Sequence, residues 1–297
     1  MTETETIDPR YRGLDTWDDQ KILSAFLDGQ ARAISAVRPA LPAIEAAAEA
    51  IAARIEPSGR LIYTGAGTSG RQAALDGMEL GATFSWPVKR LAFVLAEGFS
   101  LNPGVKSTDE DDTEAAVATI RDLKLGAADC VIAVAASGTT PFTLAAAETA
   151  KSAGALVIAI ASNPNAPLFN HADHTILLET GPEVISGSTR MSAGTAQKAA
   201  LGLLSSLLMT RLGHVHDGLM VSMRTDCSKL ERRAARIVAA IAGSTPDVAA
   251  TFLAKSDNRI KLAVLLARGA SVAQADGILA RAGGNLRVAL GLLDSAD

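Results

Sequence analysis

Residues 65–71 read Gly-Ala-Gly-Thr-Ser-Gly-Arg and follow the short apolar run at residues 61–63. Glycines at this spacing let the backbone turn sharply and approach a ligand closely. Thr68 and Ser69 are favourable N-cap residues, so we expect a helix to begin here, with Gly67 in the turn before it. Free N–H groups at a helix N-terminus, beside two hydroxyls, can bind an anion. The loop therefore predicts a site for the phosphate of a small molecule.

Two better-known glycine-rich loops fit this stretch less well. A nucleoside-triphosphate P-loop needs Gly-x-x-x-x-Gly-Lys-Ser/Thr, which the chain lacks. The spacing Gly65-x-Gly67-x-x-Gly70 does fit the dinucleotide fingerprint. However, the carboxylate expected about 20 residues later is missing, because the region near Lys89 and Arg90 is basic. A glycine-rich turn that only caps a helix is the structural alternative.

Two further segments combine small and hydroxyl residues at the expected start of a helix. One follows the apolar residues 131–135, and the other is expected to open a helix over residues 188–212. Loops at the carboxyl ends of parallel strands meet at one edge of a sheet, where such sheets bind ligands. Arg190 and Lys198 could equally be ordinary surface charges. The residues expected to contact the anion are Ser137, Gly138, Thr139 and Thr140, then Ser188, Thr189, Arg190 and Lys198.

An alternation of strands and helices is expected to position these loops. It predicts an α/β fold with a doubly wound parallel sheet flanked by helices. Helices are also expected over residues 21–55, with Pro39 and Pro42 between them, and over residues 219–242. Three short helices and a last one should follow Pro246. The expected strands are 60–64, 91–95, 130–135, 155–161 and 175–179, and the helices between them are 69–82, 112–123, 141–153 and 188–212.

The chain is long enough for a large domain and a smaller one. With 297 residues and 48% hydrophobic side chains, it can bury a sizeable core. We expect an N-terminal segment with helices at 1–55 and a sheet domain at 56–215. A connecting helix at 216–243 and a small, UBA-like helical domain at 244–297 should follow.

Composition argues against several classes of function. The net charge of −4 does not favour nucleic-acid binding, which usually needs a basic surface. No apolar stretch reaches the roughly 18 residues of a membrane span. The acidic start of the chain lacks a signal-peptide pattern, so we expect a cytoplasmic protein. Cys130 and Cys227 are expected to be free thiols. The four histidines (His171, His174, His214 and His216) are spaced like metal-binding pairs, but no third ligand is evident, so we expect no metal.

The loops at 65–71 and 136–141 resemble those of the sugar isomerase (SIS) domain family, which binds phosphosugars. More narrowly, nearly the whole chain resembles the N-acetylmuramic acid 6-phosphate etherase family. The long block from Gly181 to Lys198 is the most specific match, and it adds Glu183 to the expected substrate-binding residues. The matching motifs are Gly65-Ala-Gly-Thr-Ser-Gly-Arg71 with Leu75-Asp76 and Glu79, Ala135-Ala-Ser-Gly-Thr-Thr-Pro141, Ser162-Asn-Pro-Asn165, Gly181-Pro-Glu-Val-Ile-Ser-Gly-Ser-Thr-Arg190 and Ala193-Gly-Thr-Ala-Gln-Lys198.

The resemblance implies a carbon–oxygen lyase. Such an enzyme cleaves the D-lactyl ether of N-acetylmuramic acid 6-phosphate to N-acetylglucosamine 6-phosphate and D-lactate, in cell-wall amino-sugar recycling. It implies no metal and no organic cofactor, and a small phosphosugar rather than a nucleic acid or a membrane as the partner. The related glucokinase regulatory protein makes a non-catalytic phosphosugar-binding regulator one alternative. A phosphosugar isomerase of the same fold is another.

Eliminating lactate requires a base for the C2 proton and an acid for the departing oxygen. The resemblance maps the family's two catalytic glutamates onto Glu79 and Glu110. Each also has a structural interpretation, Glu79 as a helix-surface acid and Glu110 as part of an acidic helix start. Glu97 replaces a glycine that is usual in the family, so it is an alternative to Glu110 as the second acid or base. Departures at Leu80-Gly-Ala82, Gly218 and Ser222 leave the substrate's identity open.

The position of Glu79 suggests that two chains share each active site. Glu79 lies ten residues beyond Ser69 on the expected helix, which is about 15 Å along the axis. C2 of a sugar 6-phosphate lies much closer than this to its phosphorus. We therefore expect Glu79 to act on a substrate held by a partner's phosphate loop, in a homodimer with shared active sites.

Overall fold

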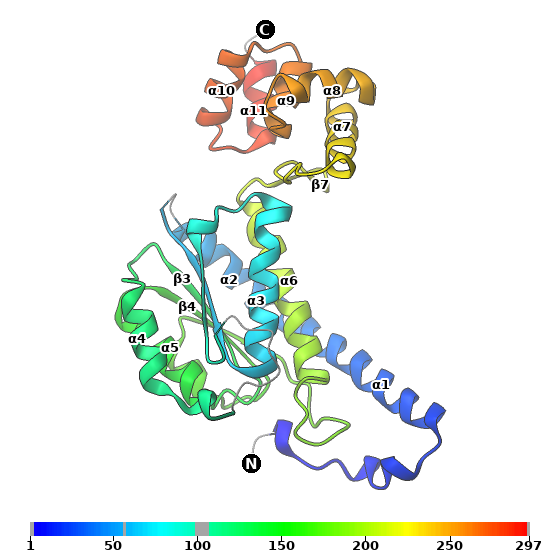
Figure 1. The fold of residues 1–297 in the computed structure, drawn as a ribbon, viewed down its shortest axis with the longest axis vertical. Coiled ribbons are helices and arrows are strands. Elements are labelled where there is room, and N and C mark those ends of the chain that lie inside the picture. The colour runs from blue at the N-terminus through cyan, green and yellow to red at the C-terminus, as the bar shows by residue number, and fades with distance from the viewer. Residues whose placement is uncertain (1–2, 56–57, 99–106, 296–297) are drawn as a thin grey trace. The chain divides into compact units, whose positions relative to one another are not determined.

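The computed structural model describes residues 3–55, 58–98 and 107–295 (Figure 1). Two compact units are present, residues 1–78 with 88–207, and residues 79–87 with 208–297. The boundary falls within α3 and α6. The sheet-bearing unit contains α1 (Asp19–Val37), α2 (Leu41–Arg54), β1 (Leu61–Gly65), α3 (Gly67–Phe84), β2 (Leu91–Leu95), α4 (Thr113–Asp122), β3 (Cys130–Val134), α5 (Pro141–Ser152), β4 (Leu156–Ala161), β5 (His174–Leu177) and α6 (Ser192–Arg211).

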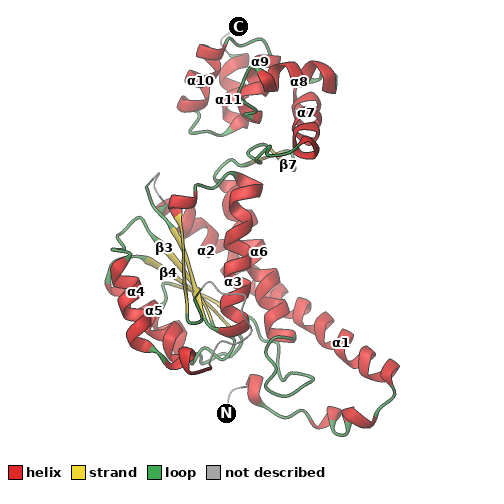
Figure 2. Ribbon diagram, in the orientation of Figure 1, coloured by secondary structure: helices red, strands yellow, loops and turns green. Residues whose placement is uncertain are grey.

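The five strands form one parallel sheet in the order β2-β1-β3-β4-β5 (Figure 2). Gly65, the last residue of β1, pairs with Leu95 of β2 and with Val134 of β3. These three strands therefore end at the same level. The loops that follow them are brought to one edge of the sheet, as the sequence predicts.

Helices cover both faces of the sheet, with α4 and α5 on one face and α3 and α6 on the other (Figure 1). Alternate strand residues such as Ile62, Val131 and Val157 join a buried cluster with Phe142 and Ala146 of α5. Burial on both faces explains why the strands are almost continuously apolar. The predicted α/β parallel sheet is confirmed.

The second unit has its own apolar core, formed by short helices. Val238, Leu253, Val264 and Leu286 are among its buried residues. The four helices predicted after residue 246 are confirmed, whereas the proposed domain boundaries and the UBA-like character stay predictions. This unit contains β6 (Val215–His216), β7 (Leu219–Met220), α7 (Ser228–Ala242), α8 (Pro246–Ala254), α9 (Ile260–Ala267), α10 (Val272–Arg281) and α11 (Leu286–Asp294).

Two predicted helices begin later than expected. The helix predicted from residue 188 begins at Ser192, after a turn in which Gly187 has a φ of +75°. The prediction of helix from residue 219 is wrong, because residues 215–220 form a two-stranded hairpin. Its connecting residues, Asp217 and Gly218, have φ angles of +48° and +74°. Asp-Gly is a common two-residue hairpin connection, and this signal was missed.

Within the described ranges, no single helix combines the length and apolar character needed to cross a membrane. The bent pair α7 and α8, at 108° to each other, meets those criteria only when the two helices are taken together.

Candidate active site

The first glycine-rich loop joins β1 to α3 through contacts that leave no room for side chains. A Cβ on Gly70 would lie 2.8 Å from the carbonyl oxygen of Gly65. A Cβ on Gly65 would lie 2.8 Å from the carbonyl oxygen of Val134. Gly67 has a φ of +53°, in the left-handed region that glycine adopts most easily. The backbone of α3 therefore starts directly against the carboxyl ends of β1 and β3.

The second predicted loop lies beside the first. Ser69 is buried, and its Oγ accepts a hydrogen bond from the Ala136 N–H at 3.3 Å. The Oγ of Ser137 accepts hydrogen bonds from the N–H of Thr139 at 3.1 Å and from its hydroxyl at 3.0 Å. Thr140 precedes α5 and makes no side-chain cap. The first N–H groups of α5 can therefore serve a ligand.

The third predicted segment meets the first loop at the start of α6. A Cβ on Gly194 would lie 3.1 Å from Cγ2 of Thr68 and 3.2 Å from the carbonyl oxygen of Thr189. Arg190 and Lys198 are both exposed. The structure thus brings residues of all three predicted phosphate-binding segments together, although they are far apart in the sequence.

Glu183 is a predicted binding residue whose two carboxylate oxygens are both hydrogen-bonded to the protein backbone. Its two carboxylate oxygens accept hydrogen bonds from the N–H groups of Ser192 and Ala193, at 2.8 Å and 2.9 Å. The side chain is buried. It caps α6 and places a negative charge at the helix N-terminus, where it is favourable. Direct binding of substrate by Glu183 stays a prediction.

Residues at the start of the chain contact the second loop through Asn163, which was not predicted from the sequence. Asn163 donates from Nδ2 to the carbonyl oxygens of Ala136 and Ser137, at 3.0 Å and 3.2 Å. Its Oδ1 accepts a hydrogen bond from the Glu3 N–H at 2.8 Å, and Nδ2 also reaches the hydroxyl of buried Thr4 at 3.3 Å. Residues 3–4 therefore support the second loop. The matching motif at Ser162–Asn165 was the available signal.

Glu110, onto which the resemblance maps the second catalytic glutamate, lies against the first loop. Its Oε1 is 2.9 Å from where a Cβ on Gly67 would be, so the carboxylate lies close to the backbone of this loop. Burial raises the pKa of Glu110, and the negative charges of Glu97 and Asp111 raise it further, against an opposing effect of Arg71. Glu110 is therefore a carboxylate that binds its proton more tightly than usual, next to the proposed phosphate site.

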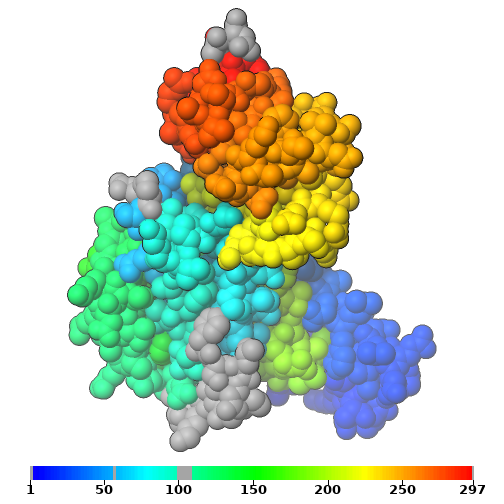
Figure 3. All heavy atoms as spheres, turned by 45° about the horizontal axis from the view of Figure 1, so that its top comes forward, coloured from blue at the N-terminus to red at the C-terminus, as the bar shows by residue number. Residues whose placement is uncertain are grey.

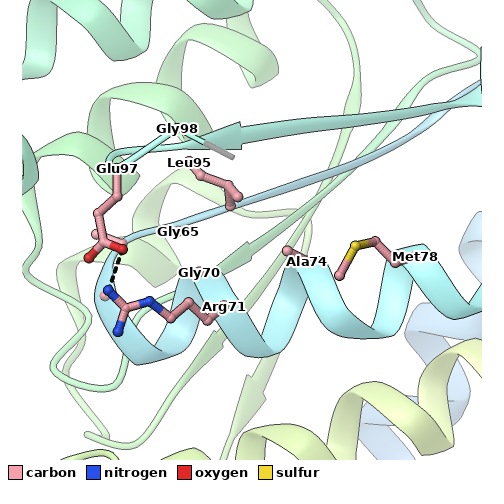
Figure 4. A pocket seen from close by; sticks show the side chains of 10 residues that line it. Gly65, Gly70, Arg71, Ala74, Met78, Leu95, Glu97 and Gly98 are labelled. Atoms are coloured by element: carbon pink, nitrogen blue, oxygen red, sulfur yellow. Dashed lines mark hydrogen bonds and ion pairs between the residues drawn. The ribbon is translucent and has the colours of Figure 1, made fainter. Parts of the chain in front are cut away.

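Glu97 and Arg71 form an ion pair at a small pocket beside this loop (Figure 4). Nη2 of Arg71 donates to Oε2 of Glu97 at 2.6 Å. The Glu97 side chain is 13% exposed and that of Arg71 is 60% exposed. The pocket has a volume of about 80 Å³. Its other lining residues are Gly65, Ala66, Gly67, Gly70, Ala74, Met78, Leu95 and Gly98.

Glu79 lies on the exposed face of α3, in contrast to Glu110. Leu75 and Met78 on that face are 44% and 46% exposed, and Glu79 itself is exposed. The space-filling view shows part of the α3 segment, in cyan, at the surface (Figure 3). Glu79 is twelve residues beyond Gly67, about 18 Å along the helix axis. Among the described residues, no hydrogen bond or ion pair of its carboxylate is found.

A buried glutamine on α6 was also missed. Gln197 is fully buried, and neither Nε2 nor Oε1 finds a hydrogen-bond partner within the described part of the chain. It lies one turn beyond Gly194, which contacts the first loop. Buried polar atoms without a protein partner are candidates for contact with a ligand or water.

Metal and thiol chemistry gain no support from the described residues. No group of three or more histidine, cysteine or acidic side chains in them could hold a metal ion. The expectation of a metal-free site stays a prediction. Cys130 and Cys227 are free, and burial raises the pKa of Cys130 to about 12, so its thiol stays protonated and unreactive.

Comparison with known proteins identifies first the class of fold. A model of the SIS domain matches residues 115–207. The solved structure of the E. coli CFT073 protein c3406 has a TM-score of 0.51 to this chain, with 17% identity, over 68% of this chain and 97% of that one. The sheet-bearing unit is therefore a SIS-type domain.

Closer relatives identify the family. An N-acetylmuramic acid 6-phosphate etherase of Deinococcus radiodurans is 44% identical over 97% of this chain and 95% of the relative. Another from Mycolicibacterium smegmatis is 39% identical over 97% of both chains. This chain belongs to the N-acetylmuramic acid 6-phosphate etherase family.

Proposed function

We propose that this chain is a carbon–oxygen lyase that cleaves the D-lactyl ether of N-acetylmuramic acid 6-phosphate. The products are N-acetylglucosamine 6-phosphate and D-lactate, and the reaction belongs to amino-sugar recycling in the cytoplasm. The observation that carries the proposal is the position of Glu110 against Gly67, in the loop where the three predicted anion-binding segments come together. The 44% identity over 97% of the chain supports the same activity.

The phosphate is proposed to bind between the first two loops. The N-termini of α3 and α5 point toward the same edge of the sheet and offer backbone N–H groups. The hydroxyls of Thr68, Ser137 and Thr139 lie in the same loops. Lys198 on α6 adds a positive charge nearby, one turn after Gly194. The backbone and hydroxyl donors fix the phosphate, and the rest of the sugar extends toward Glu110.

Glu110 is proposed to take the C2 proton, which the C1 aldehyde of the open-chain sugar makes acidic. A carboxylate with a raised pKa is a stronger base, and burial with neighbouring charge gives Glu110 that property. Glu79 then supplies the proton to the departing lactate oxygen. Water adds to the resulting double bond, which gives N-acetylglucosamine 6-phosphate. Glu97 is too firmly paired with Arg71 to be the preferred base.

A homodimer with shared active sites is proposed to complete the site. Glu79 is far along α3 from the phosphate loop of its own chain, and it lies on an exposed face with Leu75 and Met78. A second copy that covers this face would bury the two apolar side chains. It would also desolvate Glu79, which raises the pKa of a carboxylate and suits it to donate a proton.

Incubation with N-acetylmuramic acid 6-phosphate and an enzymatic assay for D-lactate tests the function. We expect lactate and N-acetylglucosamine 6-phosphate in equal amounts. If sugar phosphate binds tightly by calorimetry and no lactate appears, the chain is a phosphosugar-binding regulator. If an isomerised sugar phosphate appears instead, the isomerase alternative is correct.

A further inference from the structure

The ion pair of Arg71 and Glu97 has no substrate-binding role in the reaction proposed above, yet it borders the pocket beside the phosphate loop. Glu97 is largely buried and holds one nitrogen of the guanidinium at 2.6 Å. Arg71 is 60% exposed, so further N–H groups of its guanidinium are open at the pocket mouth. Figure 4 shows both side chains at one end of the pocket. Glu97 thus holds the guanidinium of Arg71 in place, and the remaining N–H groups of the guanidinium can donate to a ligand.

The pocket itself is small and mainly apolar. Its walls include Ala74 and Met78 of α3 and Leu95 of β2. The guanidinium of Arg71 lies at one end of this apolar lining. A cation beside a short apolar wall fits a short carboxylic acid with one methyl group.

The substrate carries one substituent of this kind. The lactyl group joins a carboxylate and a methyl group to the same carbon, and its ether oxygen is on C3, next to the carbon that Glu110 is proposed to deprotonate. The pocket shares Gly67 with Glu110. A sugar whose C2 faces Glu110 therefore presents its C3 substituent close to this pocket.

We propose that the pocket between α3 and β2 is the D-lactyl subsite, in which Arg71 binds the lactyl carboxylate and Ala74, Met78 and Leu95 surround its methyl group. This inference rests on the proposed function. Glu97 is a positioning residue that holds Arg71 in place.

The test compares two ligands that differ in the lactyl group alone. N-acetylmuramic acid 6-phosphate and N-acetylglucosamine 6-phosphate are titrated by calorimetry in a Glu79→Gln background, where the ether stays intact. Adding Arg71→Gln should weaken binding of the lactyl-bearing sugar by about 10- to 100-fold, as for a lost charged hydrogen bond. Binding of N-acetylglucosamine 6-phosphate should change by less than about two-fold, which also shows that the variant is folded.

Two further variants sharpen the result. Arg71→Lys keeps the charge without the forked donors and should give an intermediate loss. Arg121→Gln, on an exposed position of α4, is the matched control and should change neither affinity. Equal weakening of both sugars by Arg71→Gln would show that Arg71 binds the phosphate, and no weakening of either would show a purely structural pair. Both results overturn the lactyl subsite. Absence of lactate release by the unmodified chain would overturn the proposed function, and the subsite with it.

Discussion

Glu110 and Glu79 are the two carboxylates of the proposed reaction, and their surroundings in the structure are opposite. Glu110 lies against Gly67, with Glu97, Asp111 and Arg71 close enough to change its pKa. Glu79 lies on an exposed helix face beside Leu75 and Met78. The environment that tunes Glu110 is therefore present within one chain, whereas that of Glu79 is open to solvent.

In the proposed homodimer, this difference indicates which half of the site each chain would supply. The loops, Glu110 and the pocket form one continuous region at the carboxyl edge of the sheet. Glu79 lies about three turns of helix beyond Gly67 of the first loop, just after Met78 at the far end of the pocket. A proton donor needs a desolvated position to hold its proton near neutral pH. The comparison therefore predicts that Glu110 acts in its own chain and Glu79 acts on the partner's substrate.

The largest effect is expected from removing either carboxylate. Glu110→Gln and Glu79→Gln should each lower kcat by about 10²- to 10⁴-fold, the usual contribution of a general acid or base. They should differ in exchange of the C2 hydrogen with solvent deuterium, measured by NMR. Glu110→Gln should abolish this exchange and Glu79→Gln should retain it, since only the first step needs the base. Exchange in Glu110→Gln at the wild-type rate would remove Glu110 as the base.

Mixing the two inactive variants should restore activity. In a mixed dimer, one site combines the wild-type Glu110 of one chain with the wild-type Glu79 of the other. Random pairing of equal amounts makes half of the dimers mixed, so about a quarter of the wild-type activity should return. The measurement is lactate release after the variants are unfolded together and refolded.

The control is a mixture of Glu110→Gln with a phosphate-loop variant, Ser69→Ala. Both substitutions impair the same half of the site, so each mixed dimer keeps one chain with an intact Glu110 and one with an intact Ser69. Neither site of that dimer then has both residues, and activity should stay low. If the first mixture also stays inactive while co-purification of two differently tagged variants shows mixed dimers, Glu79 acts within its own chain.

Two glycines on α3 allow the surroundings of Glu110 and of Glu79 to be compared through the stability of the folded protein. Gly70 belongs to the Glu110 region, where a Cβ would lie 2.8 Å from the Gly65 carbonyl oxygen. Gly70→Ala should lower the free energy of unfolding by about 1–3 kcal/mol, the range for overpacking. Gly81 lies near Glu79, and a Cβ there meets only the Trp86 carbonyl oxygen, at 3.9 Å. Gly81→Ala should raise the free energy of unfolding by about 0.5–1 kcal/mol. Urea denaturation measures both, and equal effects would contradict the proposed packing of the loop.

The parts of this site that could be predicted from sequence are those set by local pattern. Buried strands that alternate with helices predicted the parallel sheet, and hence that loops after β1 and β3 would meet. Glycine and hydroxyl residues then identified the loops themselves. The hairpin at residues 215–220 could also have been predicted from its Asp217-Gly218 pair. A helix from residue 219 was predicted in its place.

The parts that could not be predicted depend on contacts between distant segments. Asn163 bonds to Thr4 across 159 residues, and no local pattern selects that pair. Arg71 and Glu97 meet because β1 and β2 end at the same level, which fixes their separation only once the register is known. Glu183 looked like a binding residue by family motif, and only the structure shows that it caps α6.

The smallest effect, and the most specific to this chain, concerns pH. A base works when deprotonated, so kcat/KM should fall as pH drops through the pKa of Glu110 in the free enzyme. Burial and the charge of Glu97 raise that pKa, which moves the acid limb of the profile to higher pH. Glu97→Gln removes one negative neighbour and leaves an amide oxygen to accept from Arg71. The pKa of Glu110 should fall, and the acid limb should move to lower pH.

Two controls separate this electrostatic effect from a structural one. Asp111→Asn removes a weaker contributor to the same pKa and should move the acid limb in the same direction by less. Glu114→Gln, at an exposed position of α4, should leave the profile unchanged. An alkaline limb that moves to lower pH in Glu97→Gln, with a fixed acid limb, would show that Glu110 acts in its protonated form. The roles of the two carboxylates would then be exchanged, and Glu79 would be the base.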